Sequence, residues 1–180
     1  MVRKRDRRWQ RVGAFIGLWC AGLLLLVSCA VRQAKTSTGD RIKIGTTAQV
    51  KTLDPADAYE QSSTAVIYNL GDRLYTYAPG TTELQPQLAT ALPTISADGL
   101  TYTIPLRLGV TFHDGTPFNA QAMVFSLKRF MENKGRPSFV LSSIVRSIEA
   151  TKADELTIRL QQPFAAFTSL LTFPGLCAVS

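Results

Sequence analysis

The sequence is poor in the side chains that most often carry catalysis or bind metals. Its 180 residues include one histidine, His113, and three cysteines, Cys20, Cys29 and Cys177. Three scattered cysteines form neither a disulfide framework nor a zinc site with the usual paired spacing. The sequence also lacks a G-x-S-x-G nucleophile turn, a P-loop and a G-x-G-x-x-G fingerprint. We therefore expect no cofactor, no metal site and no catalytic residue in this chain.

The sequence also predicts no nucleic-acid-binding surface, although the formal net charge is +7. Residues 1–28 hold six of the 20 basic side chains and only one of the 13 acidic ones. The remaining 152 residues carry 14 basic and 12 acidic groups, which leaves almost no excess charge. Without a basic stripe in the folded part, we expect no nucleic-acid partner.

The first 28 residues have the layout of an export signal. A basic segment precedes the apolar run from Val12 to Val27. As a helix these 16 residues would span about 24 Å, less than the roughly 30 Å of a bilayer core. An uncleaved membrane anchor is the alternative interpretation of this run.

The residues that follow favour cleavage and lipidation. Leu26-Val27-Ser28-Cys29 resembles a bacterial lipobox, in which small residues precede a cysteine whose thiol takes the lipid. An acylated Cys29 would tether the protein to a membrane while its domain stays in water. Residues 30–40 are small and polar, so we expect residues 29–40 to be the lipidated cysteine and a flexible tether. Cys177 lies in an apolar segment and is expected to be a buried structural cysteine.

Hydrophobic periodicity and turn signals predict a mixed fold after the tether. We expect strands at 41–47, on both sides of a turn at 97–99, at 144–151 and at 155–160, and helices at 62–74, at 120–132 and after Pro163. The apolar stripe of the second helix consists of Met123, Leu127, Phe130 and Met131. That of the first consists of Ala65, Val66, Leu70 and Leu74, and is widened by Ile67 and Tyr68. Strands that pair as hairpins among helices indicate an α/β fold, more closely a mixed α+β arrangement.

His113-Asp114-Gly115 is the one stretch that invites a catalytic or metal-binding interpretation. An aspartate next to the histidine in sequence cannot easily orient its ring, and two neighbouring ligands are too few for zinc. Gly115 permits a turn, and Asn119 is a good helix N-cap. We therefore interpret His113 and Asp114 as residues that satisfy backbone groups at a strand-to-helix corner.

The sequence resembles family 5 of the bacterial solute-binding proteins, which are the oligopeptide-, dipeptide- and nickel-binding components of ABC importers. The resemblance covers about residues 41–180 and consists of several segments in the family's order. They are Thr52-Leu53-Asp54-Pro55, "NLGDRLYTY", "LQPQLATAL", "LTYTIPLRLGVTFHDGTPFNAQAMVFSLKRF" and "LQQPFAAFTSLL". Two departures are Ala122, where relatives carry an acidic residue after the cap, and Pro105, which predicts a local edge or bulge in its strand.

The resemblance implies a two-lobed fold of the periplasmic-binding-protein type, of which residues 41–180 would be an N-terminal portion. It implies a binding protein rather than an enzyme, with a peptide or similar small solute and ABC permease subunits as partners. It places the protein outside the cytoplasm, in the periplasm or at the cell surface, held by its lipid. It also implies that the loop from Ala48 to Asp54 lies at the cleft, so Gln49, Thr52 and Leu53 are the expected solute contacts. An ordinary loop packed on its own lobe is the alternative for these three residues. An exported hydrolase with catalytic groups beyond residue 180 and a non-functional truncated remnant are the alternatives.

Overall fold

The computed structural model describes residues 43–180. The predicted signal peptide, Cys29 and the tether at 29–40 lie outside the described residues, as do residues 41 and 42 of the predicted first strand. Residues 46–180 form one compact unit, and this unit contains all the helices and strands described here.

A four-stranded antiparallel sheet forms the base of the unit. Its strands are β3 (Thr94–Ile95), β4 (Thr101–Pro105), β5 (Val145–Lys152) and β6 (Glu155–Leu160), in the order β3-β4-β6-β5. Alternate residues of β4, such as Tyr102 and Ile104, are buried, whereas their neighbours are partly exposed. The hairpin around residues 97–99 and the strand pair of residues 144–160 are thereby confirmed.

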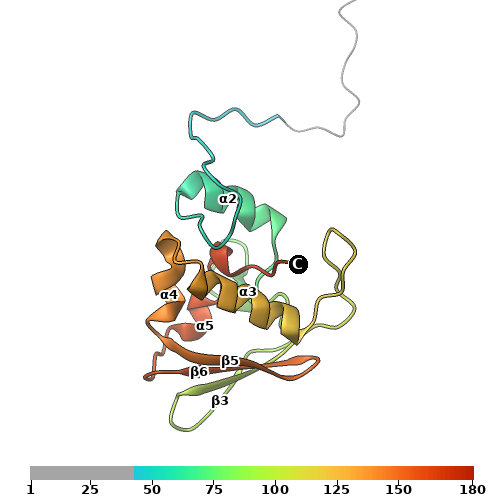
Figure 1. The fold of residues 1–180 in the computed structure, drawn as a ribbon, viewed down its shortest axis with the longest axis vertical. Coiled ribbons are helices and arrows are strands. Elements are labelled where there is room, and N and C mark those ends of the chain that lie inside the picture. Colours follow the sequence, from blue (N-terminus) through green and yellow to red (C-terminus); the bar gives the residue numbers. More distant parts are fainter. Residues whose placement is uncertain (1–42) are drawn as a thin grey trace, which may run out of the picture. The chain divides into compact units, whose positions relative to one another are not determined.

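Helix α3 (Ala120–Glu132) covers one face of this sheet (Figure 1). Its predicted bounds are confirmed, and so is its cap, because Asn119 Oδ1 accepts a hydrogen bond of 3.0 Å from the Ala122 amide. The stripe is confirmed as well, since Met123, Leu127 and Phe130 are almost completely buried. The side-chain cap at Asn119 therefore forms although the first turn of the helix contains no acidic residue.

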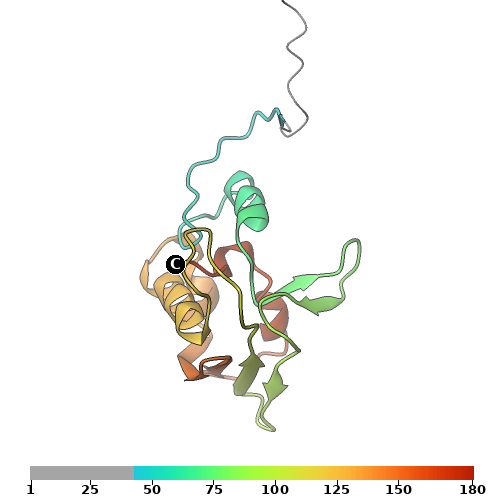
Figure 2. The ribbon, with the colours of Figure 1, turned by 90° about the vertical axis from the view of Figure 1, so that its right-hand side faces the viewer.

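Shorter elements complete the unit. They are α2 (Gln61–Leu70), β1 (Tyr75–Tyr77), β2 (Leu84–Pro86), a 3-10 turn at Arg136–Ser138, α4 (Phe139–Ser142), α5 (Phe167–Leu170) and a second 3-10 turn at Pro174–Leu176. The β1–β2 pair is a separate antiparallel hairpin that projects from the unit (Figure 2). Helices and sheets thus mix along the chain, which confirms the predicted fold class.

The expected stripe on the first helix was wrong in its main residues. Val66 and Leu70 are 36% and 55% exposed, whereas the buried residues of α2 are Ser63 and Ile67, and only Ile67 belonged to the predicted face. The helix also ends at Leu70 rather than at residue 74, because Gly71 is extended and turns the chain toward β1. A Cβ at residue 71 would come within 2.7 Å of the Cys177 Sγ, so only glycine fits this contact. Cys177 itself is buried as predicted, and its burial raises the pKa of the thiol to about 11.

The predicted strand at 41–47 was also wrong where it can be assessed. Residues 43–47 are not a strand, and Ile44 is 85% exposed. Alternating apolar residues stabilise a strand only where a neighbouring strand pairs with them. No described strand pairs with this segment.

Pro105 lies at the end of β4, which is an interior strand. It stands opposite Glu155 of β6, whereas pairing with β3 stops at Thr103. The segment before β3 occupies that side instead, since the Thr90 amide donates to the Pro105 carbonyl at 2.9 Å and Ala89 pairs with Leu106. The predicted local edge at Pro105 was therefore wrong, and so was the predicted bulge, because the register shifts of this sheet lie in β5.

Candidate functional site

The loop that carries the predicted solute contacts is fixed to the start of α2. The Ser62 hydroxyl donates to the Gln49 carbonyl at 2.6 Å. The amides of Lys51 and Thr52 both donate toward the Oγ of Ser63, at 3.3 and 3.5 Å, and Ser63 is fully buried. These bonds hold residues 49–52 against the helix, so the loop has a defined conformation.

The three predicted contact residues lie close together on this loop but differ in exposure. Gln49 and Leu53 are exposed, Leu53 by 52%, and Thr52 is half-buried. Thr52 Oγ1 accepts a hydrogen bond of 3.0 Å from the Asp54 amide, which leaves its hydroxyl hydrogen free to donate elsewhere. The loop therefore presents an amide, a hydroxyl donor and an apolar side chain.

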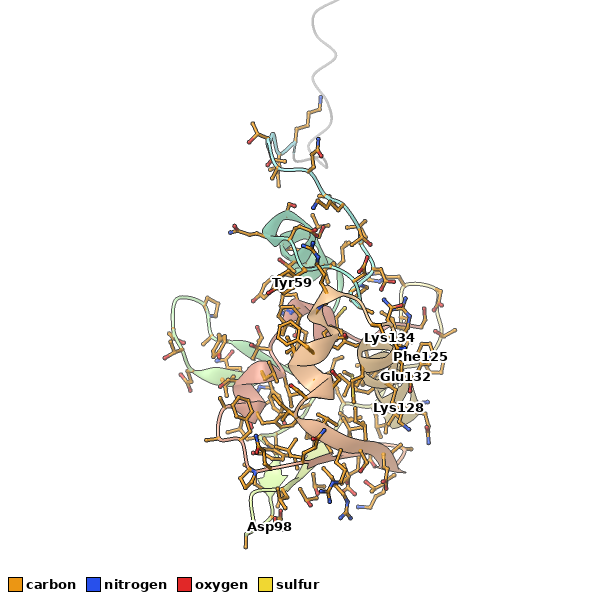
Figure 3. The ribbon with its side chains drawn as sticks, turned by 60° about the vertical axis from the view of Figure 1, so that its left-hand side comes forward. Tyr59, Asp98, Phe125, Lys128, Glu132 and Lys134 are labelled. Carbon is orange, nitrogen blue, oxygen red and sulfur yellow. The ribbon has the colours of Figure 1, made fainter. Side chains whose placement is uncertain are left out.

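Two further apolar side chains accompany these residues, and the sequence analysis missed both. Val50 is 45% exposed and Tyr59 is 51% exposed; Figure 3 shows Tyr59 at the surface near α2. Large apolar side chains on a surface loop are typical of contact surfaces. Val50 could have been found as an apolar residue of the loop that Asp54-Pro55 ends, whereas Tyr59 lies beyond that loop and had no such signal.

An ion pair with α3 fixes the other end of the loop. Arg129 Nη1 and Nη2 donate to Asp54 Oδ1 and Oδ2 at 2.7 and 2.6 Å. This bidentate interaction is the main reason why the pKa of the Asp54 carboxyl lies below its ordinary value. The sequence indicated Asp54 only as part of the segment Thr52-Leu53-Asp54-Pro55, and its partner was missed because 75 residues separate it from Arg129.

Asp54 should make the stability of the protein depend on acid. The pKa of Asp54 is lower in the folded protein than in the unfolded chain. The contribution of its ionised form to the free energy of unfolding is therefore fully present above the unfolded-state pKa, and it is lost as the pH falls through the folded-state pKa. Asp54→Asn should therefore cost about 1 kcal/mol at pH 7 and less near pH 3, a small cost because both side chains are about one-third exposed. Urea unfolding at the two pH values measures this difference. An equal cost at both would contradict the assignment.

His113 does not act as predicted at its corner. Asp114 does satisfy the turn, because its Oδ1 accepts from the amide and the hydroxyl of Thr116 at 2.9 and 2.6 Å. Gly115 adopts a φ of 87°, as the turn requires. The His113 side chain, however, is exposed and makes no hydrogen bond within the described residues. The ring lies at the edge of a cavity of about 250 Å³ that also borders Asp72.

His113→Gln should consequently leave the free energy of unfolding unchanged within about 0.5 kcal/mol, less than a lost hydrogen bond would cost. Asp114→Ala is the matched control, since it removes both bonds to Thr116 and should lower the melting temperature. Thermal unfolding of the two variants decides the question. A histidine variant that is as unstable as the aspartate variant would show that the ring holds the corner.

Neither a metal centre nor a membrane-crossing helix is found within residues 43–180. No three His, Cys, Asp or Glu side chains gather there closely enough to hold a metal ion. None of the helices in the same range is both long and apolar enough to cross a bilayer.

Comparison with known proteins identifies the family. Residues 83–179, more than half of the chain, match the family described as bacterial extracellular solute-binding proteins, family 5 Middle. The chain belongs to this family. The family consists of solute-binding proteins and not of enzymes, in agreement with the expectation from the sequence.

Individual members of family 5 resemble the chain over most of its length. The glutathione-binding protein GsiB of Escherichia coli O1:K1 is 32% identical over 157 residues, which are 87% of this chain and 29% of GsiB. The periplasmic binding protein DppA of Helicobacter pylori, in complex with the peptide STSA, is 32% identical with a TM-score of 0.63. It covers 71% of this chain, and the match covers 28% of DppA.

A third relative, NikZ of Campylobacter jejuni in complex with Ni(L-His), is 29% identical with a TM-score of 0.64. The match covers 74% of this chain and 26% of NikZ. The chain thus spans less than one-third of the length of the family 5 proteins that it matches. The described fold is accordingly a part of the periplasmic-binding-protein fold.

Proposed function

We propose that the protein is the solute-binding component of an ABC importer and that it captures a peptide or a similar small solute. The match of residues 83–179 to family 5 is the observation that carries this proposal. The relatives named above include a glutathione-binding protein and a binding protein in complex with a short peptide. Glutathione is itself a small peptide, so both point to the same class of solute.

We propose Gln49, Thr52 and Leu53 as one wall of the solute site. The loop that carries them is held by α2 and α3, and a loop already fixed in one conformation loses little entropy when a solute binds. The amide and the hydroxyl suit the peptide groups of a solute, and Leu53 suits an apolar side chain. No bond of the solute is made or broken. Closure of lobes around the solute would present the liganded form to the permease.

We further propose that the protein works outside the cytoplasm, anchored by lipid. The sequence supports this with an export signal at 1–28 and a lipobox cysteine at position 29. Residues 29–40 would then act as a tether that lets the solute-binding domain reach the permease.

A titration followed by NMR tests the solute site on the chain as it is. Glutathione added to the isotopically labelled chain should shift the amide signals of residues 48–54 with weak affinity, in the millimolar range. We expect weak binding because residues on one side of the solute leave its other side in contact with water, whereas tight sites bury most of the ligand surface. Signals that do not move, or that move only at other residues, would contradict the proposed site.

Loop variants sharpen this experiment. Thr52→Val removes a hydroxyl and Leu53→Ala removes an exposed apolar side chain, and each should weaken glutathione binding by about threefold to tenfold. Leu92→Ala is the matched control, since Leu92 is 55% exposed but lies outside the loop. Equal affinities of the loop variants and the control variant would remove these residues from the site.

A further inference from the structure

The turn after the proposed solute loop is organised around a single carboxylate. Asp54 Oδ1 accepts a hydrogen bond of 3.0 Å from the Ala56 amide, in addition to its bond from Arg129. The Asp54 carbonyl accepts from the amides of Asp57 and Ala58 at 3.1 and 2.9 Å. The conformation of residues 54–58 therefore depends on where the Asp54 side chain is held.

Helix α3 provides a rigid support for that carboxylate. Leu127 and Phe130, on either side of Arg129 in sequence, are 0% and 1% exposed, so the helix cannot rotate without disrupting the core. The end of the helix also approaches the turn closely. A Cβ at Gly135 would collide with the Ala56 carbonyl oxygen, and the side-chain Nδ2 of Asn133 donates to the same oxygen at 3.5 Å.

The chemistry of arginine suits this task better than that of lysine. A guanidinium presents two parallel N–H donors that match the two oxygens of a carboxylate, and it thereby fixes orientation as well as distance. The neighbouring Lys128 lies on the exposed side of α3 and takes part in none of the ion pairs of residues 43–180 (Figure 3). One helix thus carries two adjacent basic residues, of which only Arg129 contacts the loop.

We propose that Arg129 is a positioning residue for solute binding, which holds the loop of Gln49, Thr52 and Leu53 in its binding conformation through the Asp54 carboxylate. This inference rests on the proposed function, because it assumes that the loop contacts the solute. Thr52 connects the Asp54–Arg129 ion pair to helix α2. Its Oγ1 accepts a hydrogen bond from the Asp54 amide, and its own amide donates toward Ser63. Displacement of Asp54 would thus alter the position of the Thr52 hydroxyl.

Amide hydrogen exchange of the full chain, resolved by NMR, tests the positioning itself. In Arg129→Gln the amides of Ala56, Asp57 and Ala58 should exchange about fivefold to tenfold faster, as expected for the loss of a charged hydrogen bond that is partly exposed. Arg129→Lys keeps the positive charge but lacks the two parallel N–H donors, so it should restore only part of the protection of these amides from exchange. Lys128→Gln, the matched control, should leave exchange unchanged. Unaltered exchange of these amides in Arg129→Gln would overturn the proposal.

Glutathione titration of the same variants tests whether the positioning serves solute binding. Arg129→Gln should weaken binding by about threefold to tenfold, while the amides in the core of α3 keep their slow exchange. Faster exchange with unchanged affinity would overturn the role in solute binding. If the wild-type chain shows no shifts at the loop while the exchange result is as expected, the proposed solute site fails and the positioning of the loop by Arg129 stands.

Discussion

Replacing Phe130 with alanine should lower the free energy of unfolding by about 3–5 kcal/mol, the usual cost of removing a buried aromatic ring. Phe130 is 1% exposed and belongs to the face of α3 that packs on the sheet. Its ring also meets the edge of Phe173, with ring centroids 6.2 Å apart. The cavity left by alanine would therefore separate α3 from the segment that follows α5. A loss of this size is a large fraction of the stability of an ordinary domain.

Phe125→Ala on the same helix is the matched control. Phe125 is 52% exposed and lies on the opposite, solvent-facing side of α3 (Figure 3). The same chemical change should there alter the free energy of unfolding by no more than about 0.5 kcal/mol. Urea unfolding of the two variants measures both values. Similar losses at the two positions would contradict the described orientation of α3.

Cys29→Ser should abolish the incorporation of labelled palmitate when the protein is expressed in a bacterial host. The reason is chemical, since the serine hydroxyl does not replace the thiol that takes the lipid, and no other cysteine follows two aliphatic residues and a small residue. Loss of label should therefore be complete.

Cys20→Ser is the control for this experiment. Cys20 lies in the apolar run directly after Trp19, so it lacks the small residue that precedes a lipobox cysteine. This variant should incorporate palmitate as the wild type does. Continued labelling of Cys29→Ser would contradict the lipid anchor.

The sequence predicted those elements whose signals are local. Helix α3 was predicted with correct bounds because Asn119 caps its start and its apolar residues recur at helical spacing. The hairpin at residues 97–99 was predicted because Gly99 supplies the positive φ of 70° that its turn adopts. Neither inference requires knowledge of distant residues.

The errors arose where distant contacts decide the structure. The end of α2 was mispredicted because the chain turns at Gly71, where it approaches Cys177 more than 100 residues later in the sequence. For the candidate site, Gln49, Thr52 and Leu53 were proposed from the resemblance, but the support that Arg129 gives to Asp54 was not foreseen. A bond between residues 75 positions apart leaves no periodic signal in one sequence.

A chimeric receptor tests the central claim most directly. Residues 46–180 would replace the matching stretch of the Escherichia coli K12 glutathione-binding protein, which is 35% identical over 130 residues, so that the relative supplies the rest of the site. Calorimetry on the folded, monomeric chimera should show saturable binding of glutathione or of a short peptide at about micromolar affinity or tighter. The double variant Thr52→Val and Leu53→Ala should weaken that binding at least tenfold. A folded chimera that binds neither glutathione nor any peptide of a mixed pool would contradict the assignment of this chain to a solute receptor.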